Sequence, residues 1–171
     1  MDNKNSCIPE KNIVNALDDI PIDIFEKILK QMKKSICKIE FNNGGNGTGF
    51  FCIIPFPDKC HQLKVLITNF HVIKKEDILK DNKIKFTIDN KLNFEIKNNE
   101  YRKIYSNEEL DVTIIEIKEN DNIDMESFLE IDDKILEENP NDAYKGKSIY
   151  LIGYPEGEKQ RFANGLLKDI D

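Results

Sequence analysis

His71 and Asp111 are the residues of this chain whose types and positions best suit chemistry. The chain has only two histidines, and His71 directly follows the apolar run 65–70, so a strand over that run would bring the imidazole to the edge of a sheet. Asp111 stands at the start of a second apolar run, 112–117. An acid hydrogen-bonded to an imidazole fixes its tautomer and stabilises the imidazolium formed when the ring takes a proton from a nucleophile. The pair predicts a general base, His71, with its orienting acid, Asp111; taken singly, each residue also fits a purely structural role.

Short strands are expected to position this pair. From residue 35 onward the apolar period changes to two, and Asn42-Asn-Gly-Gly-Asn-Gly47 breaks the first run. Strand-like runs are expected at 35–41, 48–55, 63–69, 84–88, 92–96, 101–105, 112–117 and 148–154, with a hairpin turn at 89–91 and a long acidic connector at 119–141. Many brief strands without crossover helices between them favour an all-β antiparallel barrel or sandwich.

A polar segment and a short helix precede these strands. Residues 1–17 are polar, and after Pro21 the apolar side chains fall on one helical face with lysines opposite, which predicts an amphipathic helix up to Lys34. We therefore divide the chain into residues 1–34 and a main domain, 35–171. The helix either packs against its own domain or docks on another chain.

Composition excludes several classes of partner. The chain has 171 residues, 25 basic and 32 acidic, for a net charge of −7, and its lysines are dispersed among acids. Nucleic acid and anionic membranes need a concentrated cationic face, so neither is an expected partner. No run approaches the roughly 18 apolar residues of a membrane span, and the polar start lacks the features of a secretory signal, which predicts a cytoplasmic protein.

The four cysteines do not predict a metal centre. Cys52, Cys60 and His61 are close in sequence, but their spacing matches no familiar zinc pattern and a fourth ligand is not evident. Reduced thiols that act as small buried or neutral side chains are the expected state, since the chain is too long and too Cys-poor for a disulfide-stapled mini-domain. We expect no metal and no cofactor.

Four segments, in this order along the chain, resemble one known family. They are Gly47-Thr-Gly-Phe-Phe51, Thr68-Asn-Phe-His71-Val72, Leu110-Asp111-Val-Thr-Ile-Ile115 and Gly153-Tyr-Pro-Glu-Gly157. Together they resemble the trypsin-like serine proteases, more narrowly the HtrA-like type, and the following Ala163-Asn-Gly-Leu-Leu167 looks like the strand that comes next in that family. The resemblance runs from residue 35 to about residue 168.

The resemblance implies a fold and an activity. The fold would be a chymotrypsin-like antiparallel β-barrel, with the first barrel complete and the second truncated, preceded by the short helix. The activity would be serine-type endopeptidase, acting on a protein or peptide substrate, with His71 as the base and Asp111 as the acid of the triad.

The nucleophile of that family has no counterpart in this chain. Its serine lies farther downstream in a Gly-x-Ser-Gly segment, whereas residues 149–171 contain no Ser, Thr or Cys. Thr48, Ser106 and Cys52 belong to other parts of the expected fold. We therefore expect the amino-terminal part of a trypsin-like endopeptidase, inactive as this 171-residue chain.

Two alternatives remain open at this stage. The first is a non-catalytic relative that serves as a binding or regulatory module, since exposed strand edges of an incomplete barrel accept an extended peptide and also favour self-association. The second is a viral-type cysteine protease of the same fold, which needs a downstream Cys.

Overall fold

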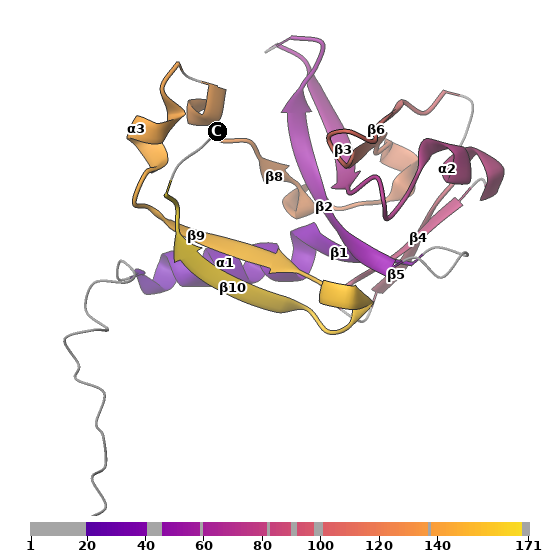
Figure 1. Cartoon of the computed structure of the whole chain (residues 1–171). Helices are drawn as coiled ribbons and strands as arrows, with labels where there is room; N and C mark the ends of the chain where they lie inside the picture. Colours follow the sequence, from indigo (N-terminus) through magenta and orange to yellow (C-terminus); the bar gives the residue numbers. More distant parts are fainter. Residues whose placement is uncertain are drawn as a thin grey trace, which may run out of the picture.

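A curled antiparallel sheet and a separate two-stranded ribbon make up most of the molecule (Figure 1). The computed structural model describes residues 20–40, 46–58, 60–81, 83–89, 92–97, 101–136 and 138–168. In chain order the elements are α1 (Ile22–Ser35), β1 (Ile36–Glu40), β2 (Asn46–Pro55), β3 (Gln62–Thr68), α2 (Lys75–Asp81), β4 (Lys83–Ile88), β5 (Leu92–Lys97), β6 (Ile104–Asn107), β7 (Val112–Glu116), the 3-10 helices η2 (Glu119–Asp121) and η3 (Met125–Ser127), β8 (Leu129–Glu130), η4 (Asp133–Leu136), α3 (Pro140–Tyr144), β9 (Ser148–Gly153), η5 (Pro155–Gly157) and β10 (Arg161–Leu166). The expected mostly-β, antiparallel character is confirmed.

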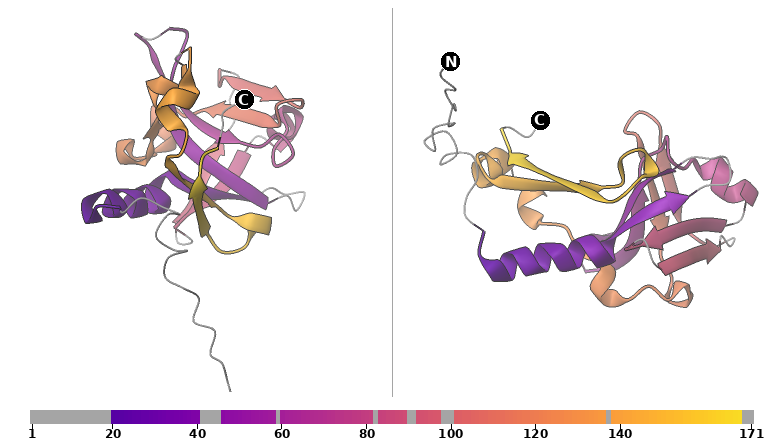
Figure 2. Two further views of the ribbon diagram at one scale, coloured as in Figure 1. Left: turned by 60° about the vertical axis from the view of Figure 1, so that its left-hand side comes forward. Right: turned by 90° about the horizontal axis from the view of Figure 1, so that it is seen from below.

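The sheet curls into a half-barrel around its longest strand, β2. Its strand order is β5-β4-β1-β2-β3-β7-β6, every neighbouring pair in that order is antiparallel, and β8 adds to β2 in parallel. The first half of β2 pairs with β1, from Asn46 to Phe50, and the second half pairs with β3, from Gly49 to Pro55. The two partners lie on opposite edges of β2 and overlap only at Gly49 and Phe50, and the two views of Figure 2 show the resulting curl of the sheet.

The concave side of the half-barrel holds the hydrophobic core. In β1, Cys37 and Ile39 are fully buried while Glu40 is exposed, as the period of two predicts. Phe51 lies near the centre, with its ring 5.4 Å from that of Phe86 and 5.8 Å from that of Phe128, both edge-on. Edge-to-face pairs at such distances add to the free energy of burial, so this cluster is a main source of stability.

Two glycines of β2 are required by close packing. A Cβ atom on Gly49 would lie 2.7 Å from Ile39 Cδ1, and one on Gly47 would collide with the side chain of Val72. Val72 is the neighbour of His71 in the chain. The Gly-Thr-Gly segment therefore lets the turn that carries His71 pack directly on the sheet.

Arg102 joins the two borders of the half-barrel. Its guanidinium donates to the carbonyl oxygen of Lys97 at the end of β5 (2.9 Å) and to that of Glu116 at the end of β7 (2.6 Å). It also forms a two-point ion pair with Asp121, at 2.7 and 2.8 Å. The Arg102 and Asp121 side chains are only 1% and 5% exposed, so this charge pair is desolvated. Strand β5 is one border of the sheet and β7 pairs with β6, the other border, so Arg102 links the two sides of the half-barrel.

Some expected elements differ from those observed. The strand expected at 101–105 begins only at Ile104, because Arg102 turns inward to the buried ion pair. Helix α2 was not expected; it buries Ile78 completely against the core. The connector expected at 119–141 contains short helices and the two-residue strand β8 rather than irregular chain alone. Residues 1–17 and most of the expected turns at 42–47 and 89–91 lie outside the described residues.

Helix α1 packs on the body of its own domain through its carboxyl-terminal half. Lys30 and Lys34 form ion pairs with Glu126 at 3.1 and 2.5 Å, and Gln160 donates to the Met32 carbonyl oxygen (2.8 Å). At the other end the apolar face is open, with Phe25 43% exposed. The helix therefore packs on its domain, as one of the two expectations had it, but over part of its length. No helix within the described ranges has the length and apolar character needed to cross a membrane.

The Glu126 contacts predict a pH-dependent contribution to stability. Hydrogen bonds from Lys34 and then Lys30 lower the pKa of Glu126 from 4.5 to about 2. Because the folded-state pKa is the lower one, the contribution is complete above about pH 4.5 and is lost as the pH falls toward 2. We expect Glu126→Gln to be less stable than the unchanged chain at neutral pH, with the difference shrinking below pH 4.5 in urea titrations. If the two proteins differ in stability by the same amount at pH 7 and at pH 2, the contribution does not come from the Glu126 charge.

The ribbon of β9 and β10 meets the sheet at Thr48 of β2. The main-chain N–H of Tyr154 donates to Thr48 Oγ1 (2.7 Å), and the Thr48 carbonyl oxygen accepts from Thr68 Oγ1 (2.8 Å). A Cβ atom on Gly153 would lie 2.8 Å from the same Thr48 oxygen. Thr48 thus sets how far the ribbon stands from the half-barrel.

This contact predicts that Gly153→Ala destabilises the chain. The added methyl group forces the ribbon away from Thr48, and overpacking of this kind costs about 1–3 kcal/mol. Gly165→Ala in β10 is the matched control, because a Cβ atom there meets nothing within 4 Å. Urea unfolding followed by circular dichroism measures both variants, and equal midpoints for the two would rule out the contact as a constraint.

Candidate functional site

His71 lies on a tight turn directly after β3. The N–H groups of Val72 and Ile73 both donate to the Asn69 carbonyl oxygen, at 3.1 and 3.2 Å. Val72 and Ile73 are buried, and Thr113 Oγ1 donates to the Ile73 carbonyl oxygen (2.8 Å) from the neighbouring strand. The main chain on the carboxyl side of His71 is therefore anchored, while the imidazole itself is 70% exposed.

Asp111 lies at the end of the turn that leads into β7. Its N–H donates to the Glu108 carbonyl oxygen (3.1 Å), and the Leu110 N–H donates to Asn107 Oδ1 (2.9 Å). Asp111 has a φ of +47°, the left-handed region, which Asp tolerates better than most residues. The turn thus ends in a residue whose backbone aims the carboxylate back across the sheet.

Strand pairing brings the two residues together. Strands β3 and β7 are antiparallel neighbours, with Thr68 opposite Thr113, so the end of β3 and the start of β7 meet at one edge. His71 Nδ1 lies 2.8 Å from Asp111 Oδ2 and 3.0 Å from Oδ1. The main-chain N–H of His71 donates to the same Oδ1 at 3.0 Å. The carboxylate therefore contacts both the ring and the backbone of His71.

Hydrogen bonds from His71 favour the ionised form of the Asp111 carboxyl group. The N–H of His71 first, and then its side chain, lower the pKa of Asp111 below the ordinary value. An ionised carboxylate accepts hydrogen bonds only, so the Nδ1 of a neutral imidazole carries the proton in this contact. The Nε2 lone pair is then available to accept a proton, which is the state that a general base needs.

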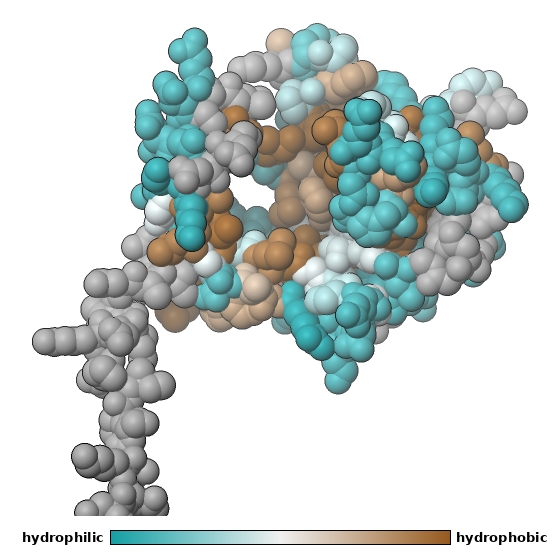
Figure 3. All heavy atoms as spheres, in the orientation of Figure 1, coloured by the Kyte–Doolittle hydropathy of each residue, from teal (hydrophilic) through white to brown (hydrophobic). Residues whose placement is uncertain are grey.

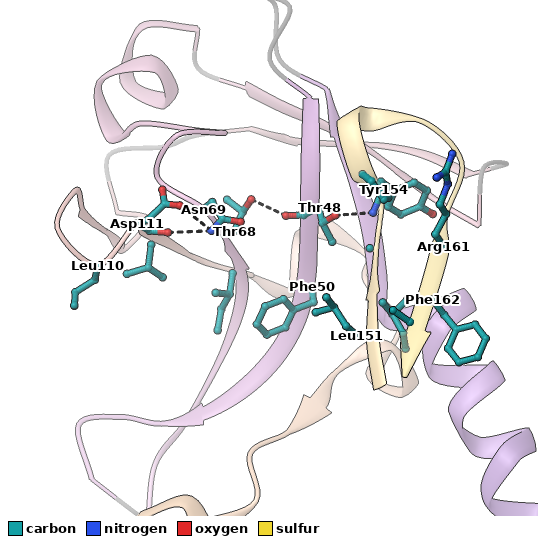
Figure 4. A pocket seen from close by; sticks show the side chains of 16 residues that line it. Thr48, Phe50, Thr68, Asn69, Leu110, Asp111, Leu151, Tyr154, Arg161 and Phe162 are labelled. Carbon is teal, nitrogen blue, oxygen red and sulfur yellow. Dashed lines mark hydrogen bonds between the residues drawn. The ribbon is translucent and has the colours of Figure 1, made fainter. Parts of the chain in front are cut away.

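An apolar cavity of about 750 Å³ lies beside Asp111, between the half-barrel and the β9–β10 ribbon (Figure 4). Thr48, Asn69 and Asp111 line it from the half-barrel, and Leu151 and Phe162 from the ribbon. Hydrophobic side chains lie on several sides of a hollow near the centre of the surface view, with polar ones also at its rim (Figure 3). Leu151 is 74% and Phe162 is 51% exposed. The acid of the pair therefore borders an open apolar cleft.

The second histidine also has a carboxylate partner, which the sequence reasoning missed. His61 Nδ1 lies 2.8 Å from Asp58 Oδ1, in the turn between β2 and β3 at the other end of these strands. Their spacing of three residues was the available signal. None of the residues lining the cavity belongs to this turn.

The structure separates the cysteines that lie near His61 in sequence. Cys52 is buried in the core, where burial raises the pKa of its thiol, whereas Cys60 is exposed. Across the described parts of the chain, no cluster of three or more His, Cys, Asp or Glu side chains is suited to bind a metal ion.

Sequence reasoning also missed two supporting residues, Asn69 and Thr113. Asn69 Nδ2 donates to Asp111 Oδ2 at 3.1 Å, and Thr113 anchors the turn after His71. Both stand inside the segments singled out in the sequence, next to an expected strand end, but no residue pattern assigned them a partner.

The chain was also compared with known proteins, and neither of two comparisons identifies a family for it. A scan against models of known protein families gives no match, and a search of curated proteins gives none either.

Proposed function

We propose that this chain carries the general base and the orienting acid of a trypsin-like serine endopeptidase, which hydrolyses peptide bonds by acyl transfer. One observation carries the proposal: His71 Nδ1 lies 2.8 Å from the carboxylate of Asp111, which lines an open cleft. The order of the segments along the chain, described above, supports it.

The half-barrel corresponds, under this proposal, to the first barrel of the chymotrypsin fold, and β9–β10 to the opening of the second. The cleft between them is where a substrate and the nucleophile would meet. His71 would accept the proton of a serine hydroxyl and later donate it to the leaving amine, while Asp111 holds the ring in the required tautomer.

The proposed serine lies outside the 171 residues. The nearer hydroxyl groups have other hydrogen-bond partners. Thr48 Oγ1 accepts a hydrogen bond from the main-chain N–H of Tyr154. The hydroxyl groups of Ser106 and Thr113 are hydrogen-bonded to each other, with their oxygens 2.8 Å apart. Cys52 is buried. We therefore expect the 171-residue chain to cleave no peptide bond by itself, and the complete gene product to do so.

Two assays test the proposal. The first is intact mass of the native protein with mapping of its carboxyl-terminal peptides, and the second is hydrolysis of a casein substrate by the chain and by the complete gene product. Peptides beyond Asp171 that contain Gly-x-Ser-Gly, together with casein hydrolysis by the complete product alone, are expected. Casein hydrolysis by the 171-residue chain that is lost in His71→Ala would show that the nucleophile has been misplaced.

One observation favours a second candidate, a non-catalytic binding module. The apolar side chains of Leu151 and Phe162 on the ribbon are exposed, as a partner-binding surface would be. A native mass of 19.9 kDa would favour this candidate, because His71 and Asp111 would then act without a nucleophile.

A further inference from the structure

Asn69 contacts both halves of the His71–Asp111 pair. Its main-chain carbonyl oxygen accepts the two hydrogen bonds that close the turn around His71, from Val72 and Ile73. Its side-chain Nδ2 donates to Asp111, to Oδ2 at 3.1 Å and to the main-chain oxygen at 3.3 Å (Figure 4). One residue therefore holds the turn of the base and the loop of the acid at once.

The amide completes the hydrogen bonding of the Asp111 carboxylate. Oδ1 accepts from the main-chain N–H of His71, and Oδ2 accepts from Asn69 and from the His71 ring. Each oxygen thus has a donor besides the imidazole, so the carboxylate is held against rotation. The pKa of Asp111 is lowered chiefly by the main-chain N–H of His71, and the hydrogen bond from Asn69 is the smallest of the contributions that lower it.

The Asn69 side chain has little part in the core. Asn69 is exposed, whereas its neighbour Thr68 is buried, and Asn69 is not a member of the hydrophobic cluster. Exposed polar side chains away from caps and buried networks usually change stability by less than about 0.5 kcal/mol when replaced. The amide therefore matters for the direction of the carboxylate more than for folding.

We propose that Asn69 is a positioning residue that fixes the Asp111 carboxylate against His71 Nδ1. This inference rests on the proposed function for its meaning in catalysis. With the amide removed, the carboxylate rotates, the hydrogen bond to Nδ1 is weakened, and part of the imidazole population moves its proton to Nε2. Imidazole rings in that tautomer can no longer accept a proton at Nε2.

Nuclear magnetic resonance of the 171-residue chain tests the geometry without any nucleophile. The Asp111 carboxyl carbon reports its titration midpoint, and the His71 ring nitrogens at pH 8 report the tautomer. We expect the midpoint to rise in Asn69→Ala and to rise further in Asn69→Asp, which lacks the donor and adds a like charge. We expect a mixture of tautomers in both variants, against the Nδ1–H form in the unchanged chain, with melting temperatures nearly unchanged.

Asn107→Ala is the matched control. Asn107 supports the same turn through the Leu110 N–H, and no hydrogen bond joins its side chain to the Asp111 carboxylate. In Asn107→Ala, the titration midpoint of Asp111 and the tautomer of His71 should equal those of the unchanged chain. The proposal is overturned if Asn69→Ala leaves the Asp111 midpoint and the His71 tautomer unchanged. It is also overturned if Asn107→Ala shifts these two readouts as much as Asn69→Ala does.

Activity of the complete gene product separates this inference from the proposed function. We expect Asn69→Ala to lower kcat by about 10- to 100-fold with KM unchanged, the range that loss of one hydrogen bond to a charged group gives. Cleavage by the unchanged protein with equal kcat in Asn69→Ala would overturn the inference alone. Absence of cleavage together with a shifted Asp111 midpoint would overturn the proposed function and leave the positioning role standing.

Discussion

We expect His71→Ala to lower kcat/KM of the complete gene product by about 10⁴-fold or more, the scale seen when one member of a catalytic triad is removed. Under the proposed function the imidazole accepts the proton of the nucleophile, and the substitution removes this acceptor. Hydrolysis of a fluorogenic peptide by the two proteins, at matched concentration and pH, measures the ratio. The loss should appear in kcat, because the ring acts in the transition state rather than in substrate binding.

His61→Ala is the control for this experiment within the same chain. His61 is the other histidine, it is 66% exposed, and it also lies 2.8 Å from a carboxylate, that of Asp58. It differs from His71 in its location, at the far end of β2 and β3. We expect its removal to leave kcat/KM unchanged. Equal losses in the two variants, or full activity in His71→Ala, would remove His71 from the mechanism.

The largest effect on stability is expected for Arg102→Ala. The substitution leaves the Asp121 carboxylate buried without its partner and removes the donors to the Lys97 and Glu116 carbonyl oxygens. Breaking a buried ion pair by removing one partner costs about 3–5 kcal/mol. A whole domain is stable by only about 5–15 kcal/mol, so much of the stability would be lost. The chain contains no Trp, so urea unfolding is best followed by circular dichroism.

Two further variants separate charge from location. Arg161, the other arginine, pairs with Glu158 at 3.2 Å on the surface, with its side chain 67% exposed. Exposed pairs contribute about 0–1 kcal/mol, so Arg161→Ala should be nearly neutral. Arg102→Lys keeps the charge but not the planar two-point geometry, and we expect an intermediate loss. Equal stability of Arg102→Ala and Arg161→Ala would contradict a linking role for Arg102.

The strands were predictable because their signal is local. Alternation places Cys37 and Ile39 on one face of β1, and that pattern is visible in the sequence. The curl of the sheet was not predictable, since it depends on how β1 and β3 are offset along the two edges of β2. The role of Arg102 was likewise hidden, because the carbonyl groups that it joins come together only when the two borders of the sheet meet.

The candidate site was predictable in its residue types and not in its geometry. His71 and Asp111 stand out because each adjoins an apolar run, but their contact depends on the pairing of β3 with β7. Asn69 had no separate signal: an Asn after a strand usually marks a turn, and its amide finds Asp111 only through that same pairing. The partial exposure of α1 also required the structure, because amphipathic spacing does not reveal how much of an apolar face is covered.

The most direct test of the central claim is labelling of the complete gene product with a serine-directed fluorophosphonate, followed by mass spectrometry of the labelled peptide. Such a probe reacts with a serine only when a base has activated it. We predict one labelled serine, in a Gly-x-Ser-Gly peptide beyond Asp171, with labelling lost in His71→Ala and kept in His61→Ala. A complete product that takes no label, or one that is labelled equally with and without His71, would contradict the account.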